Sequence, residues 1–270
     1  MYSLIDGDVL VYSCGFASQR NEYKINNNIF DYKRDANKYC TTHNIDRSLI
    51  DKKIIAEPVS HALHNVKQSL IEISQACDSH EGSIFLTGKG NYRHDVATSA
   101  VYKGNRDPSH KPVHYRAIID YLIKEWDAKV IDGMEADDAM GITQCRLNKT
   151  KNLAKKDMPI ICTIDKDLDM IPGWHYNFRK QQKYFTTVEQ SDYFFYKQML
   201  TGDRVDNIIG IHGIGDKTAD KLLLGKSVQE MEDIIINKYR QEFKDDYMKR
   251  YAENKKLLWI LREPLDGMVC

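Results

Sequence analysis

Short apolar runs recur along the first two thirds of the chain, and predicted helices separate them. The runs occupy residues 2–5, 83–86, 128–131, 159–164 and 174–178, and their lengths are typical of buried strands. Helices are predicted over residues 9–16, 57–77, 115–126 and 135–147, the second from apolar residues at helical spacing between Val59 and Ile73. This alternation predicts an α/β fold, in which a mainly parallel sheet carries helices on both faces.

The pattern changes after about residue 188. A helix over 189–200, a glycine-rich turn at 210–215 and further helices from 216 onward are predicted there. We therefore expect two parts, an α/β core over 1–188 and a helical subdomain over 189–270. Residues 20–56 are polar and irregular, with a turn expected at Asn26–Asn28, and no further element is assigned to them.

Composition narrows the class of protein. The chain has 270 residues, no net charge and no apolar run of roughly 18 residues, so no membrane span is expected. Asp6 and Asp8 interrupt the apolar N-terminus, which does not resemble a secretory signal. The six cysteines lack CxxC spacing, which favours reduced thiols and a cytoplasmic location over a disulfide frame or a zinc site.

The charges are unevenly distributed even though they sum to zero. Between Lys89 and Arg116 there are six basic residues and two acidic ones. Separate basic and acidic zones suit a protein that binds phosphates in one place and metal ions in another. The sequence has no GxxxxGK[ST] loop, HExxH pair or GxSxG elbow that would favour another chemistry.

Acidic residues follow several predicted strands or turns. There are four such clusters: Asp6; Glu135, Asp137 and Asp138; Asp165 and Asp167; Asp203 and Asp206. The carboxyl ends of parallel strands share one edge of a sheet, so we expect Asp6, Asp165 and Asp167 to converge there and the other acids to meet them in one pocket. Clustered carboxylates repel one another, and two bound hard cations, Mg²⁺ or Mn²⁺, would compensate their charge.

Each cluster also has a structural interpretation. A lone aspartate after a strand is usually a helix cap, and we expect Asp169 to be one. The acids from Glu135 to Asp138 are also what the first turn of a helix favours. A calcium loop starting at Asp165 is rejected, because Met170 and Tyr176 occupy the positions that need glycine and glutamate.

A hairpin between two predicted helices offers a phosphate site. Gly213 and Gly215 permit close approach of a backbone, the following helix N-terminus favours an anion, and Lys217 and Thr218 add polar contacts. Such contacts would be independent of base sequence. The alternative is a plain packing corner between helices.

The ordered motifs of this chain resemble those of the flap endonuclease/5′–3′ exonuclease family, especially the small bacteriophage enzymes. They are Leu4-Ile-Asp-Gly-Asp, Tyr102-Lys-Gly-Asn-Arg, Glu135-Ala-Asp-Asp, Thr163-Ile-Asp-Lys-Asp and Gly202-Asp-Arg-Val-Asp-Asn, followed by Gly210-Ile-His-Gly-Ile-Gly-Asp-Lys. The resemblance implies a PIN-like core, a helical arch over about 89–126, and a helix–three-turn–helix motif that holds K⁺. It also implies a bacterial host cytoplasm, and we expect a monomer.

The resemblance further implies roles for the acidic residues. Asp6, Glu135 and Asp137 would bind one metal ion, with Asp138 nearby, and Asp165, Asp167 and Asp203 would bind the second, supported by Asp206. The family usually has an aspartate after the second strand, where this chain has Gly88. Asp8 or Asp95 is a candidate to compensate for it.

The basic residues receive roles in the same way. Lys103 and Arg106 would lie beside the scissile phosphate and stabilise charge in the transition state. Tyr102 would stack on a base, and Lys111 and Arg116 would contact the threaded strand. The alternative for this stretch is a solvated loop.

The expected function is therefore a 5′-nuclease on DNA, with 5′ ends, flaps or RNA–DNA primer junctions as substrates. A PIN-type ribonuclease and a non-catalytic binder of branched DNA are the alternatives.

Overall fold

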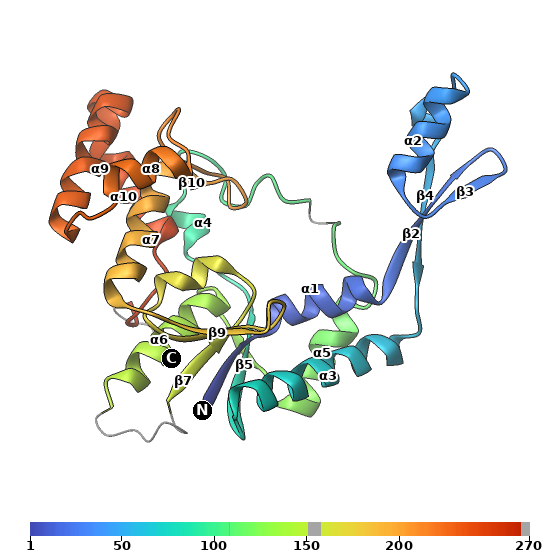
Figure 1. Ribbon diagram of the computed structural model, residues 1–270, viewed down its shortest axis with the longest axis horizontal. Coiled ribbons are helices and arrows are strands. Elements are labelled where there is room, and N and C mark those ends of the chain that lie inside the picture. The colour runs from blue at the N-terminus through green and yellow to red at the C-terminus, as the bar shows by residue number, and fades with distance from the viewer. Residues whose placement is uncertain (108, 151–157, 266–270) are drawn as a thin grey trace.

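The computed structural model describes residues 1–107, 109–150 and 158–265. Its centre is a six-stranded sheet in the order β6-β5-β1-β7-β8-β9 (Figure 1). The strands are β1 (Tyr2–Asp6), β5 (Glu81–Thr87), β6 (Lys129–Ile131), β7 (Pro159–Cys162), β8 (Gly173–Asn177) and β9 (Gln182–Thr186). The first five are parallel, and β9 pairs antiparallel with β8. The α/β fold with a mainly parallel sheet is thus confirmed.

Alternating side chains of the sheet feed two hydrophobic clusters, as the two-residue period of a strand requires. Ile5 and Ile160 point to the face covered by α1 (Gly7–Ala17), α3 (Val59–Cys77) and α5 (Tyr115–Trp126). Leu4 and Ile161 point to the opposite face, which α6 (Ala136–Asn148) and α7 (Val188–Thr201) cover. Helices therefore lie on both faces, and β1 is buried between them.

The C-terminal part is mainly helical, as expected. After α7 come the short strands β10 (Gly202–Asp203) and β11 (Ile208–Ile209), then α8 (Asp216–Leu223), α9 (Val228–Phe243), the 3₁₀ turn η4 (Lys244–Asp246) and α10 (Tyr247–Leu258). Leu223 of α8 and Tyr239 of α9 belong to the same hydrophobic cluster as Leu4 of the sheet. The division at residue 188 stays a prediction, because one continuous core crosses it.

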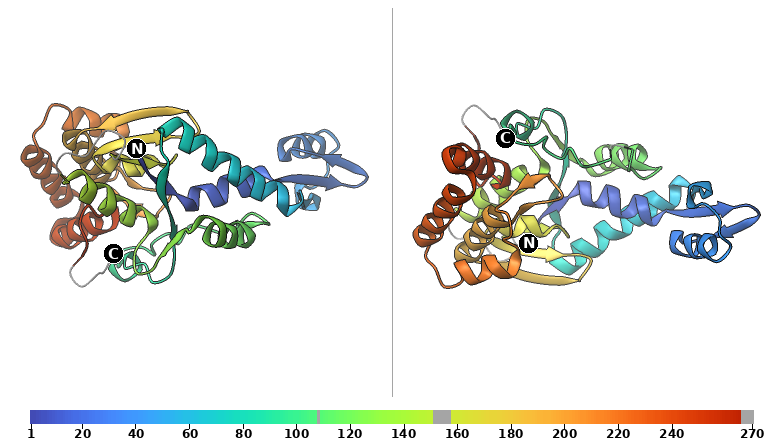
Figure 2. Two further views of the ribbon diagram at one scale, coloured as in Figure 1. Left: turned by 90° about the horizontal axis from the view of Figure 1, so that it is seen from below. Right: turned by 90° about the horizontal axis from the view of Figure 1, so that it is seen from above.

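Residues 18–57, named the arm here, form a small separate sheet. It contains β2 (Gln19–Ile25), β3 (Asn28–Phe30) and β4 (Asp51–Ala56) in the order β3-β2-β4, with α2 (Lys33–Thr42) and the 3₁₀ turn η1 (Arg47–Leu49) between them. Figures 1 and 2 show the arm projecting from the ends of α1 and α3, away from the main sheet. Its strands were not predicted from the sequence, because only a few side chains such as Tyr23 and Ile25 are buried there.

The stretch expected to form an arch has helices only at its ends. It begins with the four-residue α4 (Arg93–Val96) and ends with α5. Between them, residues 97–107 and 109–114 consist of turns and irregular backbone, and we name them the bridging segment. Lys103 N–H donates to Asp206 O at 2.9 Å at one end, and Val113 N–H donates to Gln19 Oε1 at 2.7 Å at the other. The segment therefore connects the β10–β11 hairpin to the root of the arm.

Among the described helices, none is both long and apolar enough to cross a membrane.

Candidate active site

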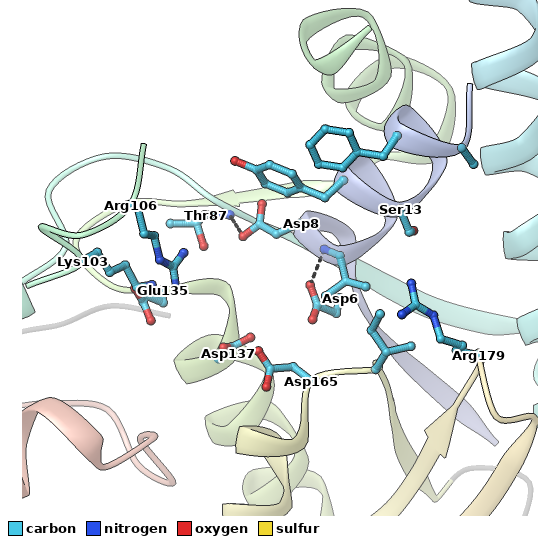
Figure 3. Close-up of a pocket in the computed structure, with 15 residues that line it drawn as sticks. Asp6, Asp8, Ser13, Thr87, Lys103, Arg106, Glu135, Asp137, Asp165 and Arg179 are labelled. Carbon is cyan, nitrogen blue, oxygen red and sulfur yellow. Dashed lines mark hydrogen bonds and ion pairs between the residues drawn. The ribbon is translucent and has the colours of Figure 1, made fainter. Parts of the chain in front are cut away.

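A pocket of about 600 Å³ lies at the carboxyl edge of the central sheet (Figure 3). Segments far apart in the sequence reach it, namely the end of β1, the first turns of α1 and α6, and the loop after β7. Each segment contributes at least one acidic side chain. The carboxylates that line the pocket are those of Asp6, Asp8, Glu135, Asp137 and Asp165. The convergence expected from strand order is therefore present for Asp6 and Asp165 but not for Asp167, and Asp8, Glu135 and Asp137 join them in the pocket.

Asp6 is both a helix cap and a pocket residue. One carboxylate oxygen accepts a hydrogen bond from Val9 N–H at 3.0 Å and so caps α1, while the other accepts one from Thr163 Oγ1 at 2.7 Å. The pKa of Asp6 is raised to about 7, mainly by burial; the two hydrogen bonds oppose this rise, and the charges of Asp8 and Asp165 add to it. Capping does not exclude ligation, because a carboxylate offers about four lone-pair positions.

Asp137 lies in the first turn of α6, where its side chain faces the pocket (Figure 3). Its surroundings raise its pKa well above the ordinary value, mainly by burial and then by the charges of Asp6, Asp165 and Glu135. Protons or cations must compensate such a concentration of carboxylates. A bound divalent ion is the compensation that leaves the acids ionised.

Asp165 connects this group to a second one. One of its oxygens caps the 3₁₀ turn η3 (Lys166–Met170) by accepting from Asp167 N–H at 2.9 Å. The pKa of Asp165 is raised by burial and by the charges of Asp206 and Asp203. Burial and the same kind of repulsion, from Asp165 and Asp203, raise the pKa of Asp167 to about 7. The charges of Asp203 and Asp206 thus act on Asp165, and that of Asp165 acts on Asp167, although Asp167, Asp203 and Asp206 do not line the pocket.

These raised pKa values predict how stability depends on pH without metal. The pKa values of Asp6 and Asp167 lie near 7 in the folded protein and near 3.8 in the unfolded chain. Between these two pH values the folded protein therefore binds more protons than the unfolded chain. Their contribution to stability is full below the unfolded pKa and is lost as pH rises through about 7. In chelator we expect Tm to be lower at pH 8 than at pH 5.5 by about 4 °C or more, and Mg²⁺ to narrow the gap. A metal-free Tm that rises over this range contradicts the assignment.

Lys103 and Arg106 also line the pocket (Figure 3), and their expected place beside a scissile phosphate stays a prediction. The Lys103 ammonium contacts Glu135, and the Arg106 guanidinium contacts Asp206. Arg106 is half exposed, and the rim therefore offers positive charge beside a strongly acidic interior. The carboxylates alone would repel an anionic substrate, and the positive charge at the rim can bind it there.

Tyr102 does not have the predicted role. Its ring is 3% exposed and belongs to the hydrophobic core, so it has no free face for a base. Its hydroxyl donates to Asp206 at 2.7 Å and also contacts Glu135 at 3.3 Å. The Tyr102 hydroxyl therefore contacts one carboxylate from each of the two acidic groups. The sequence could not reveal this, because a tyrosine in a basic loop looks the same whether its ring is buried or exposed.

Asp138 is not a metal ligand in this arrangement, which corrects the prediction. Its side chain is fully buried and turned away from the pocket toward Arg93, whose Nη2 donates to Oδ1 at 2.9 Å. It also accepts from Leu261 N–H at 3.0 Å and from Glu135 N–H at 3.3 Å, the second as part of a capping box. The hydrogen bonds to these neighbours occupy both carboxylate oxygens of Asp138.

Asp169 was predicted to be a helix cap, and this prediction is wrong. Asp165 caps the 3₁₀ turn instead, and the Asp169 carboxylate accepts a hydrogen bond from Tyr184 OH at 2.6 Å.

The place after β5 has no room for an acidic side chain. A β-carbon on Gly88 would lie 2.1 Å from Asp132 Oδ1 and 2.8 Å from the carbonyl oxygen of Ile131. Asp8 lies close by, where its carboxylate accepts from Thr87 N–H at 3.1 Å and lines the pocket. Asp95 is exposed on α4 and does not line the pocket. Of the two candidates to replace the missing carboxylate, Asp8 is in position.

The remaining predicted contacts lie outside the pocket. Gly213 has φ +75°, Gly215 is the N-cap of α8, and nothing surrounds either where a side chain would be. Lys217 and Thr218 are exposed in the first turn of that helix. In the bridging segment, the Lys111 ammonium lies 4.6 Å from the ring centre of Tyr115. The exposed Arg116 pairs with Asp120 on α5 at 3.1 Å.

Sequence reasoning missed Arg179 and Asn91. Arg179 is an exposed cation at the mouth of the pocket, just beyond the end of β8 (Figure 3). The rule that selected the acids, position after a strand, would have found it. Asn91 donates from Nδ2 to Glu135 Oε1 at 2.8 Å and orients that carboxylate.

No family model matches this sequence. The fold is similar to that of a bacteriophage T5 protein co-crystallised with metal ions, with 15% identity, a TM-score of 0.49, and coverage of 95% of this chain and 98% of that one. It is also similar to T5 5′-exonuclease with bound zinc, with 16% identity, a TM-score of 0.48, and coverage of 96% and 99%. A T5 flap endonuclease in a pseudo-enzyme–product complex with DNA and metal ions shares 15% identity, with a TM-score of 0.48 and coverage of 95% and 98%.

Proposed function

We propose that this chain is a divalent-metal-dependent 5′-nuclease, which hydrolyses phosphodiester bonds of DNA near 5′ ends or flaps. One observation carries the proposal. Carboxylates from distant parts of the chain line one pocket at the carboxyl edge of a parallel sheet, with Lys103 and Arg106 on its rim. This is the pairing of metal-binding and phosphate-binding groups that phosphodiester hydrolysis uses.

The donor chemistry of the pocket fits Mg²⁺ or Mn²⁺. Both ions prefer oxygen ligands, and Mg²⁺ commonly uses one or two carboxylates and keeps several waters. Within residues 1–107, 109–150 and 158–265, no three Asp, Glu, His or Cys side chains already stand close enough to hold one ion. Ions bound here would therefore keep water ligands, and the Lys103 ammonium would have to leave Glu135.

We assign the ligands in two groups. Asp6, Glu135 and Asp137, joined by Asp8 in place of the carboxylate absent at position 88, would hold one ion. Asp165, Asp167 and Asp203, supported by Asp206, would hold the other. When bound, two such ions activate a water molecule and stabilise the leaving oxygen.

The rim residues of the chain then have a defined task. When metal ions neutralise Glu135 and Asp206, Lys103 and Arg106 are free to contact the phosphate being cleaved. An ammonium and a guanidinium held there stabilise the negative charge that grows on the phosphate oxygens in the transition state. Arg179, at the opposite side of the mouth, is placed to hold a neighbouring phosphate.

The hairpin before α8 would bind the duplex at a distance from the pocket. Exposed N–H groups at the start of the helix, together with Lys217 and Thr218, favour a backbone phosphate. We further propose that a K⁺ ion supports this hairpin. Because such contacts read no bases, selectivity would come from the shape of the substrate.

The decisive assay uses a 5′-labelled flap and a blunt duplex, each made as DNA and as RNA. We expect Mg²⁺-dependent release of short 5′ products from DNA, and none in chelator. Cleavage of RNA alone would favour the ribonuclease alternative. Tight binding of flaps without cleavage in Mg²⁺ or Mn²⁺ would favour a non-catalytic binder of branched DNA.

A further inference from the structure

We propose that the arm provides a second nucleic-acid site, a groove at its root that binds the single-stranded 5′ portion of the substrate. The inference rests on the proposed nuclease function, because it extends the path of the strand that enters the pocket. Its ligand is single-stranded DNA, recognised by phosphate charge and base stacking.

The groove lies between the arm and the bridging segment and has a volume of about 370 Å³. Residues that line it include Phe16, Asn21, Lys52, Ile54, His110 and Lys111. Cations and aromatic rings together are the combination that binds single strands without reading sequence.

The groove and the acidic pocket share a wall. Phe16, near the end of α1, lines both of them. Its ring lies 5.1 Å from that of His110, which is exposed on the bridging segment. A strand that leaves the pocket past Phe16 therefore enters the groove directly, and its bases meet two aromatic faces.

The strand register of the arm decides which cation faces the groove. Ile54 pairs with Asn21, and Lys52 pairs with Tyr23, so alternation places these side chains on one face of the sheet. Lys53, the next residue, pairs with Glu22 and points to the opposite face. Both lysines are exposed, which makes them a matched pair.

Two hydrogen bonds fix the groove walls relative to each other. Gln19 Oε1 accepts from Val113 N–H at 2.7 Å, and His114 Nε2 contacts Glu57 O at 2.7 Å. The groove also contains one acid, Asp107, whose Oδ1 accepts from Ser109 N–H at 2.9 Å and from its hydroxyl at 2.7 Å. With that carboxylate engaged locally, Arg20, Lys52 and Lys111 supply the positive charge of the groove.

The test compares Lys52→Glu with Lys53→Glu, which change the net charge equally on opposite faces of β4. Binding is measured by fluorescence anisotropy in chelator, on a blunt duplex and on one with a single-stranded 5′ extension of about 15 nucleotides. We expect Lys52→Glu to weaken binding of the extended duplex about tenfold and to lower its salt slope by about 0.7. Lys53→Glu should stay within about twofold, and neither variant should alter blunt-duplex binding.

A second pair of substitutions changes the charge in the opposite direction. Asn21→Lys and Glu22→Gln each raise the net charge by one, and only Asn21→Lys should tighten binding of the extended duplex. Equal effects within either pair, or equal loss on the blunt duplex, overturn the proposed groove. The nuclease proposal fails separately, if the wild-type chain cleaves neither substrate in Mg²⁺. A selective loss with Lys52→Glu would still establish the groove in that case.

Discussion

Asp165→Asn is expected to lower cleavage of a 5′ flap by about 10³-fold and to leave DNA affinity within about twofold. Asp165 is the carboxylate between the two groups, since its charge acts on Asp6 and Asp137 on one side and on Asp167 on the other. Loss of that charge weakens both proposed ion sites. Asparagine retains an oxygen that can accept from Asp167 N–H, so the local turn is kept.

Three measurements make this prediction specific: single-turnover cleavage, Mn²⁺ binding by calorimetry, and Tm in chelator. Mn²⁺ affinity should fall, while the metal-free Tm should not fall, because one repulsive charge has been removed. The matched control is Asp169→Asn on the same 3₁₀ turn, whose carboxylate contacts Tyr184 and does not line the acidic pocket. Cleavage within tenfold of wild type, or equal loss of binding and cleavage, contradicts the assignment.

The second large effect is on stability. Asp138→Asn should reduce the free energy of unfolding by about 3–5 kcal/mol, because it leaves the buried Arg93 guanidinium without its counter-charge. Arg93 also donates to Leu257 O at 2.9 Å and to Trp259 O at 2.8 Å. The pair therefore holds α4, α6 and the C-terminal segment together, and its loss would loosen all three.

A double-mutant cycle separates the buried pair from a metal site. Arg93→Met combined with Asp138→Leu should cost less than the sum of the single changes, since no unpaired charge remains. The measurements are urea unfolding and Mn²⁺ titration. We expect the folded Asp138→Asn variant to bind Mn²⁺ with the same affinity as the wild-type protein. A variant with native stability and selectively lost Mn²⁺ binding would return Asp138 to the ligand set.

Much of the core could be predicted from sequence, because hydrophobic periodicity records which side of an element is buried. The helix expected over 115–126 is found as α5 (Tyr115–Trp126), and the strand expected over 174–178 is found as β8 (Gly173–Asn177). The placement of Asp6 and Asp165 follows from the same source. Asp6 ends β1 and Asp165 follows β7 by three residues, and parallel strands end at a common edge. β9 was missed, since its alternation is short and largely exposed.

The tertiary structure alone decided where individual polar side chains point. Asp137 and Asp138 are adjacent in the first turn of α6, yet one faces the pocket and the other is buried against Arg93, 45 residues away. Sequence spacing cannot supply that partner. The arm was hidden for a related reason. Its sheet buries few apolar residues, so its strands are specified by pairing between distant segments more than by their own pattern.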